Sequence, residues 1–179
     1  MTPRRLLRDV ADTAMAFKET YTADNGISQI RPTLMAYDHN GNRVVAVLMC
    51  SAKPADIGMA AFALTAAWQP SALAFVSEGF VRSYDGDDED PPALEAVCVA
   101  VHAHGHPSMS LAMPFRYLTD HVVEWGEEGK VATDTGYGSE LVSILDSAVS
   151  VEPMPGLPLS VARIECIDWL RERGDVVIT

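Results

Sequence analysis

The sequence contains no apolar run that approaches the roughly 18–20 residues needed to span a bilayer, which argues against a membrane protein. No apolar stretch follows the basic residues near the start, where Asp9 and Asp12 interrupt the chain, so we expect no secretory signal. Cysteine is scarce, and Cys50, Cys98 and Cys166 stand far apart in apolar segments. This spacing predicts buried free thiols in a cytoplasmic protein and argues against a disulfide framework or a zinc knuckle.

Basic residues are also few, with 13 Lys and Arg against 25 Asp and Glu and a net charge of −12. The imbalance falls after residue 50, because residues 51–179 hold 7 basic and 20 acidic side chains. No basic patch follows Arg4, Arg5 and Arg8, so direct nucleic-acid binding is disfavoured, since phosphate contacts need clustered Lys and Arg. A weaker alternative is an acidic nucleic-acid mimic, whose carboxylates would occupy a basic groove on another protein.

Two helices are expected in the first 70 residues. Thr2 and Pro3 are a typical helix start, and an apolar stripe follows at three- and four-residue steps: Leu7, Val10, Ala14, Phe17 and Tyr21. A second helix is predicted over 55–68, with a core face of Ile57, Ala60, Ala61, Leu64 and Trp68. Met59 and Phe62 make its other side apolar too, which predicts a second cover, either another helix or a second subunit.

Strands are predicted in antiparallel succession. Asn40-Gly41 between apolar runs at 32–38 and 43–50 is a strong hairpin signal. A further strand is expected at 72–81, an acidic loop at 83–92, and then two long strands within 93–117, joined by a turn at 105–108. Strands joined by such short links run antiparallel, because parallel neighbours need long crossovers.

The C-terminal part predicts two helices and an edge strand. The first helix is expected at 140–149, and a Pro-rich linker at 152–158 precedes a helix capped by Ser160. The inward face of that last helix is predicted to hold Val161, Ile164, Ile167 and Leu170. We therefore expect a single α+β domain over 1–179, with an antiparallel or mixed sheet of about five to six strands packed with helices.

Three of the five histidines, His102, His104 and His106, alternate at the end of a predicted strand. Alternate residues share a strand face, a spacing that suits two imidazoles binding one divalent metal such as zinc. The turn takes His106 out of the strand, so His102 and His104 are the plausible pair. Zinc then needs at least a third protein ligand, and we expect it from His106 or His121, together with a carboxylate that the sequence does not identify.

The His104-Gly-His106-Pro107 stretch is similar to the His-x-His-Pro element of JAMM-type metalloproteases. In that family a serine and an aspartate follow at fixed spacing. Pro114 and Tyr117 occupy those positions here, so membership in the family is rejected.

Glu78 is a carboxylate inside an apolar strand, which is costly to bury without a partner. The interpretations are a general base with a raised pKa, a residue at the end or on the solvent face of the strand, or a partner for Arg82 or Arg116.

The sequence contains no complete catalytic or phosphate-binding motif. The leading hypothesis is an acidic cytoplasmic protein without catalytic activity that binds another protein or self-associates, as in a homodimer, and buries the surface near Met59 and Phe62. No cofactor is expected under this hypothesis. The alternative is a metal-dependent hydrolase that uses His102, His104 and His106.

Overall fold

The computed structural model describes residues 2–82, 93–126, 137–152 and 156–179. The elements follow in the order α1 (Pro3–Asn25), β1 (Thr33–Tyr37), β2 (Arg43–Leu48), α2 (Pro54–Trp68), β3 (Ala72–Val81), β4 (Leu94–Ala103), β5 (Met109–Thr119), β6 (Val122–Trp125), α3 (Tyr137–Val149), α4 (Leu159–Glu172) and β7 (Val176–Ile178). Among these residues, no helix combines the length and the apolar character that crossing a membrane requires.

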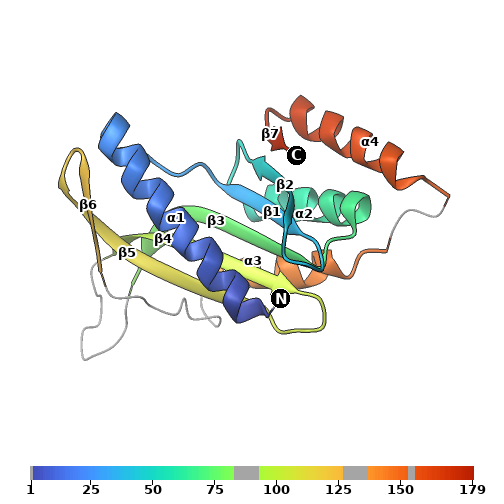
Figure 1. Ribbon diagram of the computed structural model, residues 1–179, viewed down its shortest axis with the longest axis horizontal. Helices are drawn as coiled ribbons and strands as arrows, with labels where there is room; N and C mark the ends of the chain where they lie inside the picture. Colours follow the sequence, from blue (N-terminus) through green and yellow to red (C-terminus); the bar gives the residue numbers. More distant parts are fainter. Residues whose placement is uncertain (1, 83–92, 127–136, 153–155) are drawn as a thin grey trace.

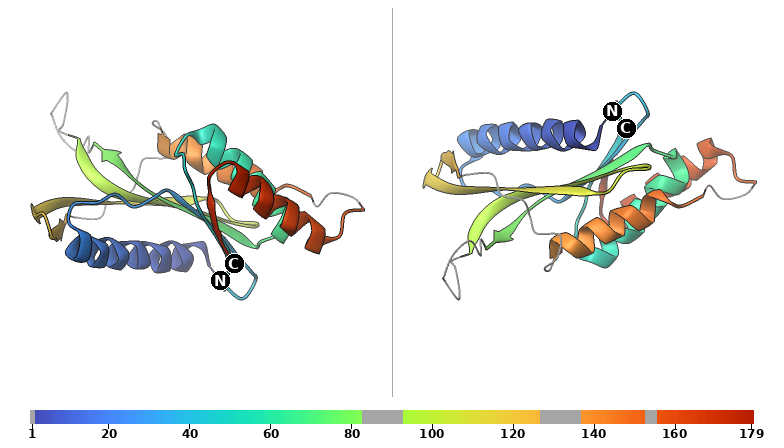
Figure 2. Two further views of the ribbon diagram at one scale, coloured as in Figure 1. Left: turned by 90° about the horizontal axis from the view of Figure 1, so that it is seen from above. Right: turned by 90° about the horizontal axis from the view of Figure 1, so that it is seen from below.

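The strands form one antiparallel sheet in the order β6-β5-β4-β3-β1-β2-β7. The predicted α+β class is confirmed, and the sheet has seven strands where about five to six were expected. Helix α1 covers one face, and α2, α3 and α4 cover the other (Figures 1 and 2). Two hydrophobic cores result, one on each side of the sheet.

Several local signals in the sequence act where they were expected, but the cap predicted at Ser160 is wrong, because α4 begins at Leu159 with Pro158 as its N-cap and no side-chain cap. The Thr2 hydroxyl accepts a hydrogen bond from the Arg5 amide and caps α1. The β1–β2 hairpin turns at Gly41, whose φ of 87° is readily available only to glycine. Strand β3 is the middle strand, and its residues 72–77 are all buried because both faces are covered. The linker predicted at 152–158 and the acidic loop at 83–92 fall partly or wholly outside the described residues.

One charged side chain of α1, Lys18, is buried against the sheet and is only 1% exposed. Its Nζ donates to Glu78 Oε1 at 2.6 Å and to the Tyr117 hydroxyl at 2.8 Å. The ammonium also donates to the carbonyl oxygen of Ser28, and it lies 4.6 Å from the centroid of the Phe115 ring. The three donors of the ammonium thus have three acceptors, which a buried charge needs.

This burial corrects the apolar stripe predicted for α1. Phe17 and Tyr21 stack on each other, with ring centroids 5.4 Å apart, and remain 52% and 43% exposed. Lys18 and Thr22 occupy the buried face in their place. The periodicity of apolar residues pointed to the wrong side of the second half of the helix, because a paired lysine can be buried where a lone one cannot.

The inward face predicted for the last helix is also wrong in part. Val161 and Ile164 are exposed, whereas Cys166 and Leu170 are the buried residues of α4. This helix contacts α2 and the edge strand β7. Only a narrow stripe of α4 is covered there, because β7 is the last strand at this edge among the residues that the structure describes.

We expect Glu78→Leu to destabilise the fold by about 3–5 kcal/mol, because it leaves the Lys18 ammonium buried without its carboxylate. The double variant Lys18→Met/Glu78→Leu should recover most of that loss, since no charge then remains buried. Urea unfolding measures both. Asp9→Asn, which breaks the exposed Arg5–Asp9 pair, is the control and should change stability by no more than about 0.5 kcal/mol. A Glu78→Leu loss as small as that of the control would contradict the role of the buried pair.

Candidate functional site

The three alternating histidines separate at the end of β4. His102 lies within the strand, opposite Leu73 of β3, and is 9% exposed. Strand β4 ends at Ala103, so His104 and His106 fall in the turn and are exposed. The predicted position of His106 in the turn is thus confirmed.

His102 belongs to a compact polar cluster with Ser108 and Asp146. Its Nδ1 lies 2.8 Å from Ser108 Oγ and also contacts Asp146 Oδ1, and the Ser108 hydroxyl donates to the same carboxylate oxygen. In a serine triad the two ring nitrogens are divided, one toward the serine and the other toward the carboxylate. Here both partners meet Nδ1, so the cluster fastens α3 to the β4–β5 turn and does not form a proton relay.

Metal binding by His102, His104 and His106 stays a prediction. Within the described part of the chain, no group of three or more His, Cys, Asp or Glu side chains is placed to hold an ion. His121 lies in the turn between β5 and β6, where its Nδ1 is 3.1 Å from the Ala23 carbonyl oxygen, at the opposite end of β5 from His106. Elemental analysis of purified, untagged protein tests the hypothesis, and stoichiometric zinc would support it.

Glu78, the candidate general base, is paired with Lys18 of α1, a partner that the sequence did not suggest. Its Oε1 also accepts the Ile30 amide at 2.6 Å. Arg116 pairs instead with Glu124 of β6. The Glu78 carboxylate thus positions α1 and the segment that follows it.

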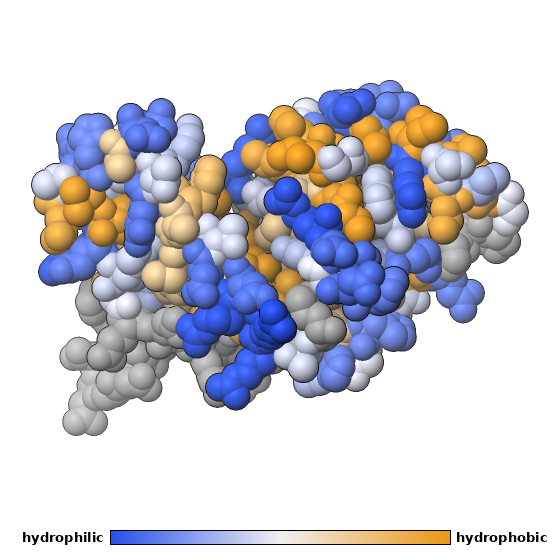
Figure 3. All heavy atoms as spheres, in the orientation of Figure 1, coloured by the Kyte–Doolittle hydropathy of each residue, from blue (hydrophilic) through white to orange (hydrophobic). Residues whose placement is uncertain are grey.

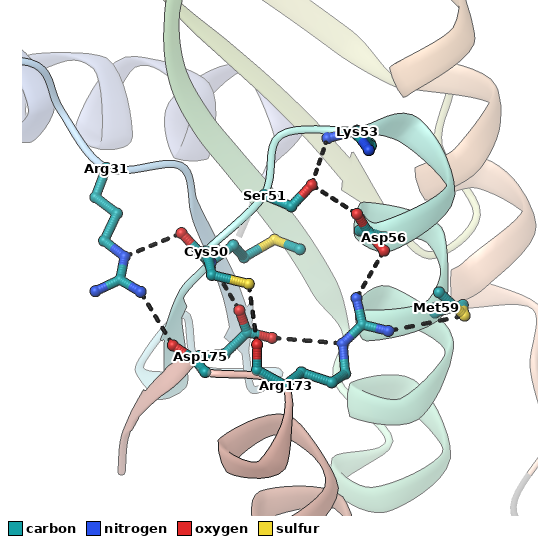
Figure 4. A network of polar contacts seen from close by, with 10 residues as sticks. Arg31, Cys50, Ser51, Lys53, Asp56, Met59, Arg173 and Asp175 are labelled. Carbon is teal, nitrogen blue, oxygen red and sulfur yellow. Dashed lines mark hydrogen bonds and ion pairs between the residues drawn. The ribbon is translucent and has the colours of Figure 1, made fainter.

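A second polar network joins α4 and β7 to α2 and β2 (Figure 4). The buried Asp175 accepts the Cys50 amide at 2.7 Å, which ties the start of β7 to the end of β2. Arg173 Nη2 lies 2.8 Å from Asp56 Oδ1, and the Ser51 hydroxyl donates to Asp56 Oδ2 at 2.6 Å. Ser51 and then Arg173 lower the pKa of Asp56, because both stabilise the ionised carboxylate.

The cysteines have raised pKa values. Asp175 raises the pKa of Cys50, whose Sγ donates to the Arg173 carbonyl oxygen at 3.1 Å. Burial raises the pKa of Cys98 and of Cys166 to about 11. All three are free, as expected, but only Cys166 is buried, whereas Cys98 is half-buried and Cys50 is exposed, which corrects the prediction that all three are buried. Neutral thiols are poor nucleophiles, so these cysteines are unsuited to covalent catalysis at neutral pH.

His104, in the turn between β4 and β5, lines an open hollow of about 420 Å³ at the end of the sheet where this turn lies. His39, Trp68 and Arg163 line it as well. Sequence reasoning missed this set because its members come from four separate segments, and each is an ordinary surface residue by local pattern.

Comparisons with protein-family models, with curated proteins and with solved structures give no match for this chain. The function is therefore argued from the geometry of the described residues.

We expect Asp56→Asn to lower the free energy of unfolding at pH 7. The variant should also lose less of its stability than the unsubstituted protein when the pH is lowered. The pKa of Asp56 lies below its unfolded value, so the ionised carboxylate stabilises the fold above about pH 4, and this contribution disappears as the pH falls further. Thermal unfolding from pH 2 to pH 7 measures the effect. Asp168→Asn, at an exposed position of α4, is the control. Parallel stability curves for Asp56→Asn and the unsubstituted protein would contradict this role of Asp56.

Proposed function

We propose that this chain is a protein-binding module without catalytic activity, and that it self-associates as a homodimer through the outer side of α2. The observation that carries the proposal is the exposure of Met59 and Phe62, which are 46% and 42% accessible although α2 lies between α3 and α4 on the sheet. Large apolar side chains at one exposed site are typical of interfaces, where methionine and aromatic residues are enriched.

The outer stripe of α2 is uncharged. Ala55, Met59, Phe62 and Ala66 lie at steps of four, three and four residues, which places them on one side of the helix. Two small residues therefore flank two large ones. An antiparallel pair of α2 helices, related by a two-fold axis between Met59 and Phe62, sets each Phe62 beside the Met59 of the other copy. The same axis sets Ala55 opposite Ala66, so the stripe is self-complementary, as a two-fold interface must be.

Charge also favours this stripe as the contact. The chain carries a net charge of −12, so two copies repel each other over most of their surfaces. Docking along the stripe of α2 buries no carboxylate of that stripe, and burial of an unpaired charge is what a tight interface must avoid.

A stable interface buries about 800 Å² on each partner, more than four side chains supply. The neighbouring helix α4 exposes further apolar residues, namely Leu159, Val161 and Ile164. Figure 3 shows apolar side chains gathered over the part of the molecule where α4 and β7 lie. Dimerisation that covers α2 and α4 together would account for the residues that the fold leaves exposed on both helices.

Light scattering at micromolar concentration tests the proposal and should give twice the chain mass. Phe62→Asp should convert the dimer to a monomer, because it places a charge in the centre of the apolar contact. Phe17→Asp is the matched control, since Phe17 is an exposed aromatic residue of α1 on the opposite face of the sheet, and this variant should stay dimeric. A monomeric unsubstituted protein, or a dimer that Phe62→Asp leaves intact, would refute self-association through α2.

A further inference from the structure

The hollow that contains His104 lies where three connections of the chain meet. Strand registers pair Tyr37 with Ala72 and Ala72 with Ala103, so the β1–β2 turn, the α2–β3 connection and the β4–β5 turn lie at one end of the sheet. Arg163 of α4 completes the lining. The volume of about 420 Å³ is within the range of small-molecule sites, and it is too small for a folded partner.

Two contacts hold the Arg163 side chain beside the hollow, and neither uses its terminal nitrogens. Its Nε donates to the Ala67 carbonyl oxygen at 3.3 Å, and its guanidinium carbon lies 5.9 Å from the centroid of the Trp68 ring. None of the described carboxylates forms an ion pair with Arg163, so its terminal nitrogens remain available for an anion. A guanidinium fixed in this way binds a carboxylate with two parallel hydrogen bonds.

The one carboxylate among the lining residues is already used by its own turn. Asp38 Oδ1 accepts the amides of Asn40 and Asn42 at 2.9 and 2.8 Å, and Oδ2 accepts the Asn42 side chain at 3.2 Å. Asp38 is therefore occupied by its hairpin, whereas Arg163 forms no ion pair with a carboxylate in the part of the chain that the structure describes. His39 and His104 add two imidazoles to the lining, which are suited to donating hydrogen bonds to an anion.

The lining also has an apolar part. Trp68 presents an indole ring, and Val44 contributes an aliphatic side chain from β2. Gln69, next to Trp68, is the only described residue other than glycine with a positive φ, at 49°. This left-handed residue is the C-cap that ends α2, and its amide donates to the Thr65 carbonyl oxygen.

From these contacts we infer that the hollow binds a small organic anion in which a carboxylate is attached to a flat ring. The carboxylate binds the terminal nitrogens of Arg163, and the ring packs on Trp68 and Val44. The residues that line the hollow lie outside the α2 stripe of Ala55, Met59, Phe62 and Ala66.

Benzoate is the probe ligand, and its binding to the full chain is measured by two-dimensional ¹H–¹⁵N NMR. The Trp68 indole signal and the His104 amide should shift saturably. Arg163→Gln should weaken binding at least tenfold, as expected for loss of a charged hydrogen-bonding partner. Arg163→Lys keeps the charge but not the planar guanidinium, so its affinity should lie between those of the unsubstituted protein and Arg163→Gln. Arg171→Gln is the matched control, since Arg171 is an exposed arginine on the same helix that does not line the hollow, and its affinity should be unchanged.

Two further ligands separate the two parts of the inference. Benzyl alcohol, which keeps the ring without the charge, and inorganic phosphate, which keeps a charge without the ring, should each bind at least tenfold more weakly than benzoate. Phosphate binding as tight as that of benzoate would refute the role of the ring. Absence of saturable shifts at Trp68 and His104, or equal affinity in Arg163→Gln and the unsubstituted protein, would refute the site.

Discussion

The buried ion pair between Lys18 and Glu78 is the constraint on which the rest of one layer depends. A buried ammonium needs three acceptors, and the structure supplies them from three places: β3, β5 and the segment after α1. The pair therefore fixes both the rotation of α1 and its position across the sheet. Pairs of this kind contribute little net stability compared with apolar residues, but they tolerate few alternative arrangements. We interpret Lys18 as the residue that specifies where α1 lies, while the apolar contacts of Leu6 and Val10 supply most of the stabilisation.

This placement of α1 leaves the two ends of the sheet unequal. The helix contacts mainly β4, β5 and β6, so the same face of the sheet at β7 exposes Val176 and Ile178. The edge strand is secured by polar contacts instead, because Asp175 binds the end of β2 and Arg173 binds Asp56 of α2. A strand of three residues cannot bury enough apolar surface to hold itself, which explains why charged side chains cluster at its start.

The sequence predicted the elements well and their partners poorly, for a physical reason. Caps, glycine turns and apolar runs act within a few residues, so the Thr2 cap, the Asn40-Gly41 hairpin and the span of β3 were all predictable. The choice of buried face depends on contacts distant in sequence, which is why Phe17 and Ile164 were placed inside. The candidate sites show the same limit. The histidines were noticed, but the partner of His102 lies 44 residues away on α3, and the lining of the hollow comes from four segments.

Both proposed sites share helix α2, and its packing explains why both can be preformed. Its inner face holds Ile57, Ala60, Ala61 and Leu64, all fully buried between the sheet and the other helices. A helix held in this way cannot rotate without opening the core, since protein interiors are close-packed. Its outer stripe and its C-terminal Trp68 are thus presented in fixed positions, one toward a second copy and the other toward the hollow. Binding at either place then loses little conformational entropy, which is the condition under which small contact areas give measurable affinity.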